Sequence, residues 1–202
     1  MFLRHGLARP VLAALVGLGA GVVCLPSAQA SAGVPAPAAG GVSVTYACTS
    51  AIGSLKLVVK ASGVTPASVP VDTGVKMSAA QLRLTVPAVY VNKVISFTNA
   101  KSASGKSTKL DISSTNADVA TVNAAATPIA FGPIPLIKNK SAVLALPAKP
   151  ATFGSWVASD SHGSVMTFSA GEVVVSMKIG HFSGVATCKP TSTVALSTTK
   201  VA

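Results

Sequence analysis

Apolar and polar residues alternate over short stretches along much of this chain. Residues 42–48 alternate in this way and put four side chains on one face, Val42, Val44, Tyr46 and Cys48. Residues 81–86 alternate as well, and Pro87 ends that stretch because proline has no N–H to donate to a neighbouring strand. A period of two residues predicts a half-buried β-strand in both places.

Further short strands are expected between turn-forming residues, at 54–60, 107–113, 118–122, 131–137, 141–146, 153–158, 164–168, 172–179 and 184–188. The stretch at 131–137 contains two prolines, so a strand there should lie at a sheet edge. Residues 88–97 fit neither the strand period nor the helix period cleanly, and a short helix across one end of the domain is one interpretation.

The number and spacing of these strands predict an all-β fold. Short strands with turn signals every 8–12 residues or so are typical of antiparallel β-sandwiches, and a cysteine pair that spans the domain favours an immunoglobulin-like one. We expect the β-sandwich domain to cover residues 42–190. A flexible leader at 31–41 precedes it, and a Ser/Thr-rich C-terminal tail at 191–202 follows it.

The first thirty residues have the pattern of a cleaved signal peptide. Arg4 and Arg9 lead into the apolar run at 11–23, and Ala28-Gln-Ala30 supplies small residues at a cleavage site before Ser31. The apolar run is shorter than the roughly 20 residues that a membrane-spanning helix needs. We therefore expect a secreted protein with no membrane span after cleavage, and no lipid attachment at Cys24.

Cleavage would remove Cys24 and leave one pair of cysteines, Cys48 and Cys188. Disulfides persist in extracellular compartments, so this pair predicts a bridge that encloses almost the whole domain.

The mature chain would be basic, with 14 basic and 5 acidic residues and a formal charge of +9. All but one of the basic residues are lysines, scattered singly, and aromatic residues make up only 4% of the chain. This distribution gives a diffuse positive field without the arginine clusters and stacking aromatics that nucleic-acid recognition uses. We expect no nucleic-acid partner and no cofactor.

Several groups of residues invite a catalytic interpretation. Residues 104–108 resemble the end of a phosphate-binding loop, but the leading glycine is missing at Ala100, and a lysine-bearing hairpin loop is the preferred interpretation. Asp160, Ser161 and His162 are adjacent, so they cannot assemble as a hydrolase triad does, and a turn is preferred.

The chain also contains residues that could bind a metal or act on a sugar. His162 and His181 could meet across a sheet, yet no third metal ligand is evident once the cysteines are paired. The acidic residues are Asp72, Asp111, Asp118, Asp160 and Glu172. None of them sits in a recognisable glycosidase context. Trp156 is expected to pack over the disulfide rather than to stack on a sugar. We therefore predict no catalytic, cofactor or metal site.

Two motifs carry a resemblance to a known family. The chain has Val44-Thr-Tyr46-Ala-Cys48 near its start and a Gly171-Glu-Val strand followed by Thr187-Cys188-Lys-Pro190 near its end. In these motifs it resembles a family of secreted actinobacterial domains of unknown function that begin with Tyr-x-Cys and end with Cys-x-Pro. The resemblance covers about residues 42–190 and implies a sandwich with a Cys48–Cys188 bridge. It implies no known chemistry.

Three classes of function follow from these observations. The favoured hypothesis is a secreted, non-catalytic domain at the cell envelope that binds anionic cell-wall polymers or an envelope protein through its lysines. The alternative is a structural or adhesive β-domain that acts by self-association. An enzyme is the third class, and no motif supports it.

Overall fold

The computed structural model describes residues 41–51, 53–159 and 163–202. These residues form eleven strands and one helix: β1 (Val42–Ser50), β2 (Gly53–Val64), β3 (Ser68–Val69), β4 (Gly74–Val86), α1 (Ala88–Thr98), β5 (Ser102–Ser114), β6 (Thr121–Asn123), β7 (Ile129–Pro135), β8 (Ala142–Val157), β9 (Val165–Ile179), β10 (Phe182–Pro190) and β11 (Ala195–Val201). The predicted signal peptide, nearly all of the predicted leader, and the triplet at 160–162 lie outside the described residues. The all-β prediction is confirmed.

All of the described strands belong to one mixed sheet. Its main path runs β3-β11-β9-β10-β1-β2-β4-β8, and β5 pairs with β9 on the side opposite β10 and β11. Every strand pair is antiparallel except β3 with β11. An immunoglobulin-like sandwich has two separate sheets. The described strands instead form one continuous sheet, because β9 joins β5 to β10 and so links the parts that a sandwich keeps apart.

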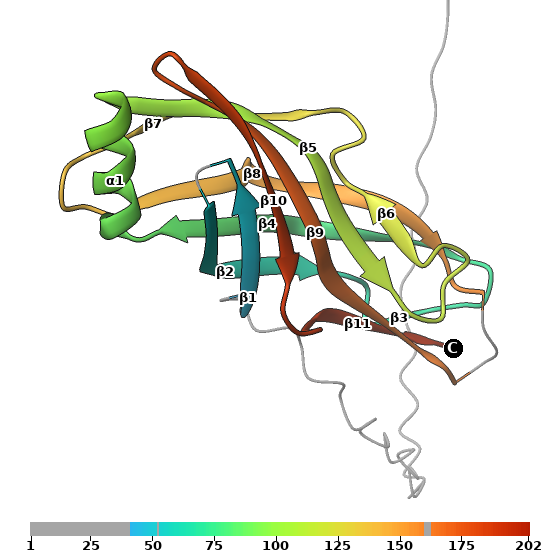
Figure 1. Ribbon diagram of the computed structural model, residues 1–202. Coiled ribbons are helices and arrows are strands. Elements are labelled where there is room, and N and C mark those ends of the chain that lie inside the picture. The colour runs from blue at the N-terminus through green and yellow to red at the C-terminus, as the bar shows by residue number, and fades with distance from the viewer. Residues whose placement is uncertain (1–40, 52, 160–162) are drawn as a thin grey trace, which may run out of the picture. The chain divides into compact units, whose positions relative to one another are not determined.

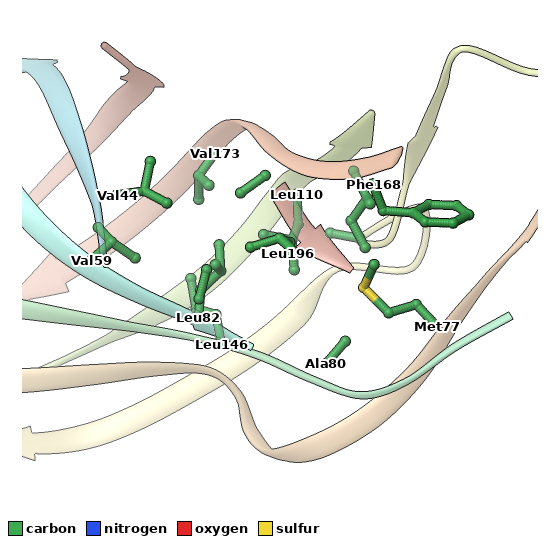
Figure 2. Close-up of a cluster of buried hydrophobic side chains, with 14 of the residues drawn as sticks. Val44, Val59, Met77, Ala80, Leu82, Leu110, Leu146, Phe168, Val173 and Leu196 are labelled. Atoms are coloured by element: carbon green, nitrogen blue, oxygen red, sulfur yellow. The ribbon is translucent and has the colours of Figure 1, made fainter. Parts of the chain in front are cut away.

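The sheet turns over a single apolar core. Strands β4 and β8 cross below β5 and β9 (Figure 1). Leu82 and Leu146 on the lower strands lie opposite Leu110 and Val173 on the upper strands (Figure 2). These side chains are buried because each strand turns alternate residues to this side. The core therefore fills the space between two parts of the same sheet.

Helix α1 connects β4 to β5 at one end of the sheet (Figure 1). Pro87 precedes the first turn, and its carbonyl accepts hydrogen bonds from the N–H groups of Tyr90 and Val91. Asn99 ends the helix in a left-handed conformation and donates its N–H to the Ile95 carbonyl, a common way for helices to terminate. The short helix considered for residues 88–97 is confirmed.

Two pairs of predicted strands are single long strands. Residues 141–146 and 153–158 fall almost entirely within β8, although Pro147 and Pro150 lie between them. These prolines are tolerated because β8 pairs with β4 on one side only among the described residues, and the register shifts opposite them. Residues 164–168 and 172–179 likewise merge in β9.

The predicted C-terminal tail is wrong, because residues 195–201 form β11 and pair with β9. Three buried hydroxyl groups hold this strand against the end of β2. Thr65 and Ser197 lie 2.7 Å apart through their hydroxyl oxygens, and Thr199 donates to the Thr65 hydroxyl at 2.8 Å. The Ser/Thr content that suggested a tail thus contributes a buried hydrogen-bond network.

Candidate apolar cavity

The predicted disulfide is confirmed and lies within the sheet. Cys48 on β1 and Cys188 on β10 are directly opposite in the antiparallel register, with their Cα atoms 4.0 Å apart. Both residues are almost completely buried. The bridge therefore fixes one wall of the core next to helix α1.

An apolar cavity of about 140 Å³ lies beside this disulfide and is partly open to solvent. Eight strands contribute to its wall, and α1 covers it with Tyr90, Val91 and Val94. Strands β4 and β8 supply Leu84 and Leu144 on one side. The other sheet side chains of the wall include Leu57, Phe131, Ile134, Val175, Met177 and Ala186.

The wall of this cavity has almost no polar chemistry. Among the described residues, no charged side chain lines it, and Ser50 and Tyr90 are its only hydroxyl-bearing residues. An apolar cavity of this kind excludes water more readily than it excludes an apolar ligand. The site can therefore bind an apolar group through shape and burial.

Sequence reasoning missed the cavity because its wall comes from elements far apart in the chain. One local signal existed in α1. Tyr90, Val91 and Val94 recur at helical spacing and point to the same side, as a helix that covers an apolar surface requires.

Two of the five acidic residues meet on the sheet. Lys109 Nζ lies 3.3 Å from Asp111 Oδ2 and 3.3 Å from Glu172 Oε1, and Lys189 Nζ lies 3.5 Å from Glu172 Oε2. The hydrogen bonds to Asp111 and Glu172 raise the pKa of Lys109 above its ordinary value. These carboxylates are engaged by lysines outside the cavity, so they form an ion-pair cluster.

The other acidic residues have local roles or lie outside the described part. Asp118 Oδ1 accepts hydrogen bonds from the Val119 and Val157 N–H groups at 2.8 and 2.7 Å. Asp72 occupies the turn before β4 with a positive φ of 59°. Asp160 is not described.

Residues 104–108 lie in strand β5, so the predicted hairpin loop is wrong. Gly105 pairs with Met177 on β9 and with Phe131 on β7. A side chain at Gly105 would collide with the Ser176 carbonyl oxygen and the Phe131 ring, so glycine allows three strands to approach closely here.

Trp156 is fully buried, as expected of a core residue, but its aromatic partner is Phe168. The two ring centroids are 5.0 Å apart at an interplanar angle of 69°, and Trp156 is not part of the cavity wall next to the disulfide. His181 lies exposed in the turn between β9 and β10, whereas His162 lies outside the described residues. In the part of the chain that the structure covers, no three His, Cys, Asp or Glu side chains cluster as metal ligands would.

These features define an all-β domain with one internal disulfide and one helix over an apolar cavity. The chain belongs to a family of unknown function, DUF6801, whose model matches residues 45–200. The resemblance to a family of unknown function is thus confirmed at that level. The matched range includes most of β11, in agreement with its place in the sheet. No curated protein matches the chain.

A solved structure shares the fold. It is that of a protein from Corynebacterium diphtheriae described as membrane anchored, with a TM-score of 0.51 and 16% sequence identity. The similarity covers 80% of this chain and 37% of that chain, so this domain spans little more than a third of that protein. Among the residues described for the present chain, no helix has the length and apolar character needed to cross a membrane.

Proposed function

We propose that this domain is a secreted, non-catalytic binding protein of the actinobacterial cell envelope, and that it holds an apolar ligand in the cavity beneath α1. The observation that carries the proposal is the cavity itself, with its apolar wall, in which none of the described lining residues is charged. The signal-peptide pattern, the disulfide and the description of the structural neighbour as membrane anchored support an extracellular or envelope location.

The size of the cavity limits the ligand. A cavity of about 140 Å³ matches an engineered apolar cavity of ~150 Å³ that binds benzene, so about six carbon atoms fit without movement of α1. Leaving such a cavity empty costs about 3 kcal/mol of stability at ~24 cal/mol per Å³. A short aliphatic chain, or the end of a longer one, would recover part of that free energy.

Neutral alcohols test this proposal without involving the charge of the protein. Calorimetric titration with butanol, hexanol, octanol and decanol should give affinity that rises about fourfold for each buried CH₂ and then levels off when the cavity is full. Ala186→Leu should fill the cavity and abolish binding. The matched control is Ala47→Leu, which adds the same volume to the exposed face of β1. Equal weak binding by all three proteins would contradict the proposal.

A second candidate function is binding of anionic cell-wall polymers, as the charge of the chain suggested. The observation in its favour is that Lys60 on β2 and Arg83 on β4 are exposed and directly opposite in register. Like charges in this arrangement destabilise a sheet. A polyanion laid across these strands would relieve the repulsion, and an acidic segment of an envelope protein would do the same.

Cosedimentation with purified cell wall across a salt series tests this second function. Binding should weaken as the screening length falls to about 8 Å near physiological salt. Lys60→Gln with Arg83→Gln should bind less than Lys149→Gln with Lys200→Gln, which removes the same charge elsewhere. Binding that is independent of salt would contradict it. Association of the protein with itself in a sedimentation series at increasing concentration would favour the structural or adhesive alternative.

A further inference from the structure

The outer side of α1 carries apolar side chains that nothing described in the chain covers. Val89, Lys93 and Phe97 recur every four residues and form one exposed stripe along the helix. Phe97 is 82% exposed and Val89 is 60% exposed. An aromatic side chain this exposed on a helix whose inner side already covers the core has no role in packing.

The loop between β7 and β8 extends the same surface. Asn92 donates to Asn139 Oδ1 at 2.9 Å, and the Asn139 N–H donates to Asn92 Oδ1 at 2.8 Å. These two hydrogen bonds fix the loop beside α1 at the same end of the sheet (Figure 1). The loop adds Ile137, which is 48% exposed, with Lys138 and Lys140.

The charged side chains described in α1, at Lys101 and in the loop between β7 and β8 are all positive. The Leu136 N–H donates to the Lys101 carbonyl at 2.8 Å, which brings a further lysine to the loop. The α1 end thus carries four exposed lysines, Lys93, Lys101, Lys138 and Lys140. Residues 87–101 and 136–141 contain no acidic residue, and none of these four lysines takes part in the ion pairs found among the described residues.

We propose that the α1 end docks on the surface of an anionic phospholipid bilayer. Exposed aromatic and aliphatic side chains enter the boundary between headgroups and acyl chains, while surrounding lysines are attracted to anionic headgroups. The helix would lie in the plane of the interface, because Val89 and Phe97 are on one stripe along its length.

Docking in this orientation gives the cavity a source of ligand. Tyr90, Val91 and Val94 of this helix line the cavity, while its Val89 and Phe97 side chains are exposed. The helix would then separate the cavity from the acyl chains, and a small displacement of it would connect them. This second step rests on the proposed function, whereas docking itself does not.

Vesicle cosedimentation tests the docking. Wild-type protein should bind vesicles of 30% phosphatidylglycerol in phosphatidylcholine and should bind pure phosphatidylcholine at least about tenfold more weakly. Lys93→Glu with Lys138→Glu and Lys140→Glu should lower affinity for the anionic vesicles more than about tenfold. The matched control reverses three exposed lysines elsewhere, Lys76, Lys149 and Lys200. Equal loss in the control would show attraction by net charge and would overturn the proposed surface.

Substitutions at Phe97 distinguish binding to a bilayer from binding to a soluble polyanion. Phe97→Ser should weaken vesicle binding about tenfold and leave any binding of soluble polyphosphate unchanged. Phe97→Trp should retain vesicle binding, shift its fluorescence to shorter wavelength on docking, and be quenched by lipids brominated on their acyl chains. Full binding by Phe97→Ser, or an unquenched Phe97→Trp, would overturn the proposal and indicate a polyanion as the partner.

The cavity function and the docking of the α1 end can be overturned independently. Ala186→Leu should abolish alcohol binding and leave vesicle binding intact, because position 186 faces the cavity and not the outer side of α1. Vesicle binding without alcohol binding in the wild type would overturn the cavity function alone. Alcohol binding without vesicle binding would overturn the docking surface alone.

Discussion

Cys48 and Cys188 are cross-strand neighbours in one sheet and also line the same cavity. They are 140 residues apart in sequence, yet β1 and β10 are adjacent. The disulfide therefore joins the first strand in the sequence to the last strand but one, and it holds a wall of the candidate ligand site.

Replacing both cysteines by serine should lower the free energy of unfolding by about 5 kcal/mol, because the bridge closes a loop of 140 residues in the unfolded chain. Urea denaturation at neutral pH measures the change. Reduced and alkylated wild type should behave like the double variant. A denaturation curve of the double variant that matches the wild type would show that the bridge does not stabilise the fold.

Leu144→Ala should enlarge the cavity from the β8 side. The loss of a buried leucine should cost about 2–5 kcal/mol, and octanol should restore more stability than it gives the wild type, because more of its chain fits. Thermal unfolding with and without octanol measures both effects. Leu146→Ala, fully buried on the same strand but outside this cavity, should lose similar stability and gain no extra effect of octanol.

Gly105→Ala should destabilise the domain by about 1–3 kcal/mol, because the added methyl group has no room between β7 and β9. Gly74→Ala is the control, since nothing lies within 4 Å of a methyl group there. Equal melting temperatures for the two variants would show that the three strands do not meet closely at Gly105.

Thr199→Val should weaken the attachment of β11 to β2. It keeps the shape of the side chain but removes the hydroxyl that donates to Thr65, so we expect a loss of about 1–3 kcal/mol. Thr198→Val changes the opposite side of the same strand and should cost less than about 0.5 kcal/mol. Hydrogen exchange of the β11 amides reports whether the loss is local to this strand.

Tyr46→Phe should change the response of the protein to alkaline pH. The Tyr46 hydroxyl donates to the Gly171 carbonyl at 2.9 Å, so its loss should cost about 1 kcal/mol at pH 7. Burial raises the pKa of Tyr46 above its ordinary value of 10.0. The folded state thus favours the protonated hydroxyl, and the wild type loses this stability as pH rises above 10.0, where the unfolded chain ionises.

Phenylalanine cannot ionise, so the stability difference between the two proteins should shrink or reverse above pH 10.0. The raised pKa of Lys109 acts in the same direction in both proteins and cancels in the comparison. Urea denaturation between pH 7 and pH 11 tests this; a constant difference across the range would contradict the role of burial at Tyr46.

The strands with clean alternation could be predicted from sequence. Residues 42–48, 54–60 and 184–188 all lie in observed strands, because each has one face in the core and one in solvent. Helix α1 gave a weaker signal for a physical reason. Its inner residues Val91 and Val94 are apolar, and so are Val89 and Phe97 on the outside, so the contrast between its faces is small.

The C-terminal strand and the cavity could not be predicted from the local pattern of apolar and polar residues. In β11 the buried positions include Ser197 and Thr199, whose hydroxyl groups satisfy each other through Thr65, so polar residues occupy core positions. The cavity depends on how distant strands are paired. Nothing in the sequence near Cys48 indicates that Leu144 and Met177 share its surroundings.

The pairing of β1 with β10 also determines when the cavity can exist during biosynthesis. A chain that emerges N-terminus first presents β1 and β2 early, but β10 must wait until almost every other strand has appeared. Contacts between such distant segments form slowly. The cavity wall beside the disulfide is therefore complete only after nearly the whole domain has been synthesised, so the growing chain has no finished cavity in which to hold an apolar molecule.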